Sequence, residues 1–135
     1  MSQDAEQKRQ AGVVKHAEAV NKADVTAGTA TQMQVLIGPA DKAPNFALRR
    51  FIMAEGGGMP MHTNTVEHEQ YVLCGRAEVG IGGKVHEVRQ GCVLLIPAGV
   101  PHYYKVLEAP FEFLCMVPNS PDQIRILPGE QNPSC

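Results

Sequence analysis

Residues 56–102 read GGGMPMHTNTVEHEQYVLCGRAEVGIGGKVHEVRQGCVLLIPAGVPH, and this stretch decides the fold. Two runs within it, 77–81 and 84–89, are joined by Gly82-Gly83, which is the signature of a β-hairpin with a two-residue turn. A third run, 93–96, is apolar and ends at a Pro-Ala-Gly turn. Short runs closed by glycine and proline predict antiparallel strands rather than helices.

The same pattern continues on both sides of this stretch. Further strands are predicted over 32–37, 47–54, 68–74, 102–107 and 111–117, with a loop at 56–58 and a break at 108–110. Eight to ten short strands with frequent turns predict an all-β sandwich or barrel. We expect this β domain to span 31–117, between an N-terminal arm, 1–30, that holds at most a short helix and a proline-rich tail, 118–135, with one strand near 123–127.

Composition narrows the classes of function. The 135 residues fit one domain, and a net charge of −2 with seven aromatic residues argues against a nucleic-acid-binding surface. No apolar run is long enough to span a membrane, and the polar first ten residues do not form a signal peptide. The four cysteines are widely spaced, without a C-x-x-C pair. We therefore expect a cytoplasmic protein that binds neither nucleic acid nor membrane.

Histidines stand out near the ends of the predicted strands. His62 and Asn64 are two residues apart, so on a strand both side chains face one side. His68 follows a short break after which the chain enters the next strand, and His102 follows the Pro-x-Gly turn. These residues are the candidates for a shared site.

Two motifs in this region resemble those of the cupin family, G-x5-H-x-H-x3,4-E-x6-G and G-x5-P-x-G-x2-H-x3-N. Seven of their ten fixed positions agree in order, and fifteen residues separate the two motifs. The resemblance implies that 31–117 form a small antiparallel β-barrel of the jelly-roll type, with a metal at its centre. The matching residues are Gly56, His62, Gly75, Gly91, Pro97, Gly99 and His102.

Three positions depart from the family pattern. Asn64 replaces the second His, His68 occupies the Glu position, and Val106 replaces the final Asn. The chain thus resembles small bacterial cupins with four histidines, with Asn64 in place of one His. The resemblance implies that His62, His68 and His102 bind one divalent transition metal, with Asn64 as a weak fourth position. Imidazole suits Fe, Mn, Ni, Cu and Zn, so the ligands do not identify the metal.

Other side chains near the predicted ligands are candidates for positioning water or substrate. Gln70 and Tyr104 each lie two residues beyond a predicted ligand on the same strand, and so face the same side. Together with Asn64, they are the candidate catalytic residues. Glu69 should point away from the site, whereas Tyr71 is expected in the core.

The resemblance implies a metalloenzyme of the dioxygenase or oxidoreductase type that acts on a small oxygen-bearing substrate. Neutral ligands leave the full charge of the dication, which favours an enolate or carboxylate. Two alternatives remain open: a cupin isomerase or lyase using the same site without redox change, and a non-enzymatic cupin that binds or senses a sugar-like ligand. A homodimer is expected, because small cupins pair their barrels and edge strands need cover.

Overall fold

A computed structural model of the chain describes residues 11–128. Its regular structure consists almost entirely of strands, because short alternating runs separated by turns leave little room for helices. Two 3-10 turns, η1 (Ala17–Ala19) and η2 (Pro39–Asp41), accompany eight strands. The strands are β1 (Ala23–Asp24), β2 (Thr29–Ile37), β3 (Phe46–Asn64), β4 (His68–Ile81), β5 (Lys84–Arg89), β6 (Val93–Ile96), β7 (His102–Pro118) and β8 (Ile124–Ile126).

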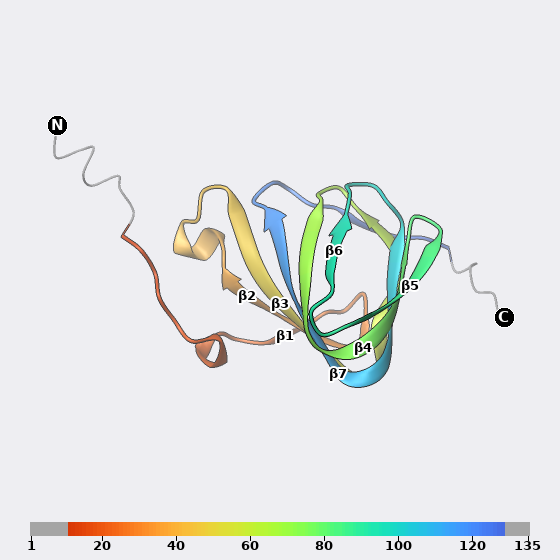
Figure 1. Cartoon of the computed structure of the whole chain (residues 1–135). Helices are drawn as coiled ribbons and strands as arrows, with labels where there is room; N and C mark the ends of the chain where they lie inside the picture. Colours follow the sequence, from red (N-terminus) through yellow and green to blue (C-terminus); the bar gives the residue numbers. More distant parts are fainter. Residues whose placement is uncertain (1–10, 129–135) are drawn as a thin grey trace.

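The strands form one antiparallel sheet that curls into a jelly-roll barrel (Figure 1). Its main order is β1-β2-β3-β7-β4-β5, while β6 pairs with β4 and β8 pairs with β3. Three long strands, β3, β4 and β7, run through both halves of the barrel. The predicted all-β barrel is therefore confirmed.

The long strands replace some of the predicted breaks. Residues 56–58 and 108–110, predicted as loops, lie inside β3 and β7. The pairing of β3 with β7 shifts register between Met53 and Gly58, so the strand bends there without ending. The glycine and proline residues in the sequence correctly indicated where the strands bend. They did not indicate that the strands continue across these bends.

The core lies between the two halves of the barrel. Alternation along the strands buries Met53 of β3, Val72 and Val79 of β4, and Phe111 and Phe113 of β7 almost completely. The same alternation turns the opposite side chains outward. The interior of the barrel is thus mostly apolar, with polar side chains at a few inward-facing positions.

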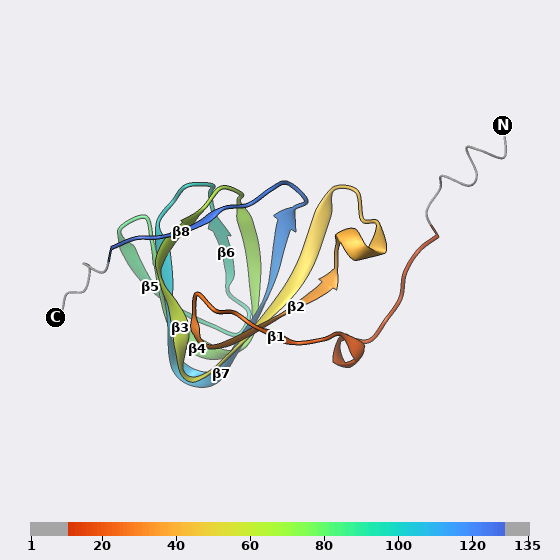
Figure 2. The ribbon, with the colours of Figure 1, turned by 180° about the vertical axis from the view of Figure 1, so that it is seen from behind.

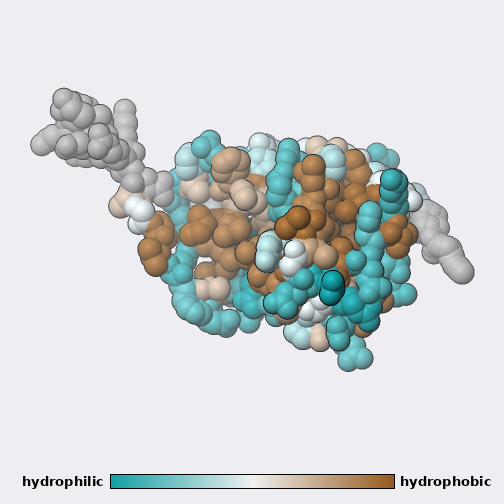
Figure 3. Space-filling view, in the orientation of Figure 1, coloured by the Kyte–Doolittle hydropathy of each residue, from teal (hydrophilic) through white to brown (hydrophobic). Residues whose placement is uncertain are grey.

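One prediction about the core is wrong. Tyr71, expected inside, is 50% exposed, because its neighbours Gln70 and Val72 take the inward positions on β4. Tyr71 pairs with Val93 on β6, and both contribute to an outer face that also carries Leu95. Figure 3 shows apolar side chains gathered on this side of the molecule. The homodimer stays a prediction.

The barrel begins earlier in the chain than predicted. β1 and the start of β2 lie within the stretch assigned to the arm. Figure 2 shows the segment around β1 and the segment with β8 on the same side of the barrel. These two segments bring residues from near the two ends of the described chain to one cavity. Within residues 11–128, no helix has the length and apolar character needed to cross a membrane.

Candidate metal centre

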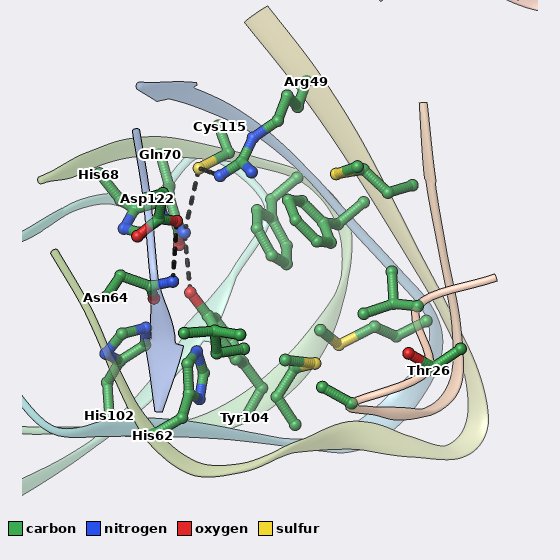
Figure 4. A pocket seen from close by; sticks show the side chains of 18 of the residues that line it. Thr26, Arg49, His62, Asn64, His68, Gln70, His102, Tyr104, Cys115 and Asp122 are labelled. Atoms are coloured by element: carbon green, nitrogen blue, oxygen red, sulfur yellow. Dashed lines mark hydrogen bonds between the residues drawn. The ribbon is translucent and has the colours of Figure 1, made fainter. Parts of the chain in front are cut away.

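A cavity of about 360 Å³ opens inside the barrel, and every predicted site residue lines it (Figure 4). Each of three long strands contributes a pair of these residues, because residues two apart on a strand share a face. The pairs are His62 and Asn64 from β3, His68 and Gln70 from β4, and His102 and Tyr104 from β7.

The three imidazole rings lie together on one side of the cavity. His62 is paired with His102 across β3 and β7, and their ring centroids are 4.1 Å apart. The ring of His68 lies 5.9 Å from that of His102. The predicted convergence of the three histidines, from separate strands, is therefore present in the structure.

Backbone carbonyls fix the tautomers of two of these rings. Nδ1 of His62 lies 2.7 Å from the Pro60 oxygen, and Nδ1 of His102 lies 2.9 Å from the Val100 oxygen. A carbonyl oxygen only accepts, so in each neutral ring Nδ1 carries the proton and Nε2 keeps its lone pair. This is the arrangement in which histidine binds a metal through Nε2.

The ring of His68 differs from the other two. Its Nδ1 is buried and has no hydrogen-bond partner within the described residues. Burial, together with the nearby Arg49 guanidinium, lowers the pKa of His68 to about 3. Burial also lowers the pKa of His102 to about 4 and holds the pKa of His62 below its usual value. At neutral pH all three rings are unprotonated and able to donate lone pairs.

We predict that these buried rings make the metal-free protein sensitive to acid. The unfolded chain protonates His68 near pH 6.5, whereas the folded protein does so only near pH 3. The free energy of unfolding is therefore highest above pH 6.5 and falls as the pH drops towards 3. His68 alone accounts for a loss on the order of 2 kcal/mol between about pH 7 and pH 5. Urea unfolding of the chelated protein measures this slope. His68→Gln should flatten it, and the exposed control His86→Gln should not.

Asn64 has a fixed orientation. Its Nδ2 donates to Oδ2 of Asp122 at 3.1 Å, and Oδ1 of the same carboxylate accepts from the Thr65 amide at 2.9 Å. Only the amide nitrogen of Asn64 can donate to a carboxylate, so its Oδ1 is left free as an acceptor or ligand. Asp122 belongs to the stretch between β7 and β8, beyond the predicted β domain, and no motif indicated it.

The second polar cluster of the cavity lies around Gln70. Its Nε2 donates to the Tyr104 hydroxyl at 2.7 Å and lies 3.5 Å from Sγ of Cys115. Burial raises the pKa of Tyr104, so the phenol keeps its proton at neutral pH. Arg49 also lines the cavity and was missed by the sequence analysis. Its signal was present: Arg49 shares strand parity with the inward Met53.

An apolar wall forms the rest of the cavity. Tyr104, Phe113 and Phe51 form a stack of nearly parallel rings, with successive centroids 5.3 and 5.0 Å apart. Met53 and Met59 complete this wall. The cavity therefore has a histidine-rich end and a flat apolar side.

Other titratable side chains on or near these strands lie outside the cavity. Glu69 is exposed while its neighbours His68 and Gln70 are buried, which confirms the outward orientation of Glu69. His16 and His86 are both exposed and do not line the cavity.

The side chains that line the cavity include the types of donor that bind a transition metal. Within residues 11–128, no three His, Cys, Asp or Glu side chains are positioned around a common point as a metal site. The rings nevertheless supply three neutral donors, two with the tautomer that ligation through Nε2 needs. The buried ring nitrogen of His68 without a partner is the kind of group that a metal would satisfy.

The sequence and the fold agree with one known family. Residues 49–117 match the family model described as Cupin domain, which covers half of the chain. The chain belongs to the cupin family. The match includes all six predicted site residues of this cupin and excludes Asp122.

Solved structures support the same assignment. The polyketide cyclase RemF from Streptomyces resistomycificus is 28% identical, with a TM-score of 0.79 over 87% of this chain and 86% of that one. A cupin 2 domain-containing protein from Halorhodospira halophila is 27% identical, with a TM-score of 0.68 over 74% and 72% of the two chains. KdgF from Halomonas sp., at 16% identity, shares the fold, with a TM-score of 0.71 over 82% and 96%. No curated protein matches the chain.

Proposed function

We propose that this cupin is a metal-dependent enzyme that deprotonates a small, enolisable substrate without redox change, as a cyclase, isomerase or lyase does. The observation that carries the proposal is that three neutral imidazoles share a single cavity with the carboxylate of Asp122, which acts electrostatically on all three. The similarity to RemF, a polyketide cyclase, adds support. The sequence alone favoured a dioxygenase, with this chemistry as an alternative.

His62, His68 and His102 would hold the metal. When bound, a divalent ion supplies positive charge that stabilises an enolate oxygen. Asn64, oriented by Asp122, presents its Oδ1 as a further ligand or as an acceptor for water.

The other cavity residues would handle the substrate. Asp122 is the carboxylate that acts on all three histidines electrostatically, and it accepts the proton removed from the carbon next to the carbonyl. The Tyr104 O–H donates a hydrogen bond to a substrate oxygen. The stacked rings of Phe51 and Phe113 exclude water and favour a flat unsaturated body over a sugar.

A dioxygenase is the second candidate, because three neutral histidines also suit iron or copper with positions left open for oxygen. It would use the same ligands and the same apolar wall. The two functions differ in whether oxygen is consumed and whether a redox-inactive metal suffices.

The test uses benzoylacetone, a β-diketone that both chemistries accept. The zinc-loaded protein should convert it to the enolate, with or without oxygen, as followed by ultraviolet absorbance. Asp122→Asn should slow this step by about a hundredfold or more. Consumption of benzoylacetone only with iron or copper and with matching oxygen uptake would establish the dioxygenase instead. No metal-dependent change in either experiment would contradict both.

The position of Asn64 gives a separate prediction. Asn64→His supplies a fourth imidazole where the family usually has one, so it should tighten zinc binding by about tenfold or more. Competition titration against a chromophoric chelator measures the change. Thr63→His, one residue away and on the opposite side of β3, is the matched control and should leave the affinity unchanged. An unchanged affinity in Asn64→His would mean that this side chain does not reach the ion.

A further inference from the structure

Two adjacent arginines on β3, Arg49 and Arg50, differ in their hydrogen-bond and ion-pair partners. Arg50 is neutralised by an ion pair: its Nε and Nη2 donate to Oε1 of Glu112 at 3.1 and 2.6 Å, and its Nη1 donates to Oε1 of Gln34 at 3.1 Å. Arg49, on the opposite face of the strand, lines the cavity. It forms no ion pair with any carboxylate in the part of the chain that the structure describes.

Arg49 has weak partners for a half-buried cation. Its Nη2 lies 3.3 Å from Sγ of Cys115, and its guanidinium carbon lies 5.1 Å from the centre of the Phe51 ring. Burial raises the pKa of the Cys115 thiol, so the sulfur is uncharged and does not neutralise the guanidinium. Nε of Arg49 is buried without a hydrogen-bond partner within residues 11–128. A buried donor without an acceptor costs free energy unless a ligand supplies one.

A second donor lies along the same chain of contacts. The Tyr104 hydroxyl accepts from Gln70, and Gln70 also contacts Cys115, which in turn contacts Arg49 (Figure 4). Because the Tyr104 oxygen accepts this bond, its own O–H remains to donate to something else. This end of the cavity therefore offers hydrogen-bond donors together with an unneutralised positive charge, which is the complement of an anion.

The surroundings of these donors indicate the shape of the anion. The guanidinium of Arg49 packs over Phe51, whose ring continues the stack of Phe113 and Tyr104 along the cavity. A flat unsaturated body lies well against such a wall, and its charged group then reaches Arg49.

We propose that Arg49 and Tyr104 form an anion-binding subsite that takes the carboxylate of a planar, unsaturated acid. The claim that such an acid is the substrate of the enzyme rests on the proposed function. The claim that the subsite binds such an acid rests on Arg49 and its neighbours and needs no metal.

The experiment compares two probes of the same shape, 2-naphthoate and the neutral 2-naphthamide. Their binding to the full-length protein is measured calorimetrically at neutral pH, before and after chelation of any metal. The wild-type protein should prefer naphthoate by about tenfold or more in both states, since a charge-assisted hydrogen bond is at stake. Arg49→Gln should reduce this preference to less than about twofold, and Arg49→Lys should keep part of it.

Arg89→Gln is the matched control, because Arg89 is exposed on β5 and does not line the cavity. It should keep the full preference for naphthoate. If circular dichroism shows that Arg49→Gln does not fold, Tyr104→Phe decides. This variant retains the charge and removes one donor, so a several-fold loss of naphthoate affinity supports the subsite and an unchanged affinity overturns it.

Zinc titration of the same proteins separates this inference from the proposed function. Zinc binding without any preference for naphthoate would overturn the subsite and leave the metal site intact. A preference for naphthoate that depends on Arg49, without zinc binding, would establish the subsite and contradict the proposed enzyme. A preference that survives in Arg49→Gln would overturn the assignment of this residue.

Discussion

His102→Ala should remain folded and lose at least about a hundredfold in affinity for zinc. Changes to residues that merely orient a ligand already cost about ten- to a hundredfold, so removing a ligand costs at least as much. His102 is the central ring of the three: the rings of His62 and His68 lie 4.1 and 5.9 Å from it. Metal analysis of protein purified without an affinity tag, followed by competition titration, measures the loss. His68→Ala should behave in the same way.

Glu69→Ala is the matched control for these variants. Glu69 is adjacent to a predicted ligand and is itself of a ligand type, but it points out of the barrel. Its removal should leave zinc affinity within about twofold of the wild type. A large loss in Glu69→Ala, or full affinity in His102→Ala, would show that the ion binds elsewhere.

Much of this site was predictable because of the two-residue period of strands. His62 and Asn64, and likewise His68 and Gln70, share a face by spacing alone, and the structure places both pairs in one cavity. The two motifs then placed these strands in a known barrel. The same period applied to Tyr71 would have put it outside, opposite Gln70; its aromatic character suggested the core instead.

Asp122 was not predictable from local pattern. It reaches the site through the chain reversal after β7 and the pairing of β8 with β3, which aligns Asn64 with Ile124. Such a contact depends on tertiary structure between residues 58 positions apart. Arg49 is a different case, since a cation on the inward parity of an apolar strand was visible in the sequence. Its importance became clear only when the structure showed that, unlike Arg50, it has no carboxylate partner and its Nε has no acceptor within the described residues.

The largest loss of stability is expected from Gly75→Ala. Gly75 has φ = +81° and lies on β4 where the pairing with β7 shifts register. A Cβ there would overlap the carbonyl oxygen of Pro110 and lie 2.7 Å from that of Glu108. Both are backbone atoms of β7, so they cannot move aside without disturbing the barrel. An alanine in this left-handed backbone conformation is strained. This strain and the overlap together should lower the free energy of unfolding by at least about 3 kcal/mol.

Gly91→Ala separates the two contributions. Gly91 has a similar φ of +91°, but a Cβ there meets no atom within 4 Å, so this variant carries only the backbone strain. It should lose about 1 kcal/mol, and urea unfolding of the metal-free proteins measures both losses side by side. Equal losses would mean that the close approach of β4 and β7 at Gly75 relaxes at little cost. A clear excess for Gly75→Ala would show that this motif glycine allows the two strands that carry His68 and His102 to meet.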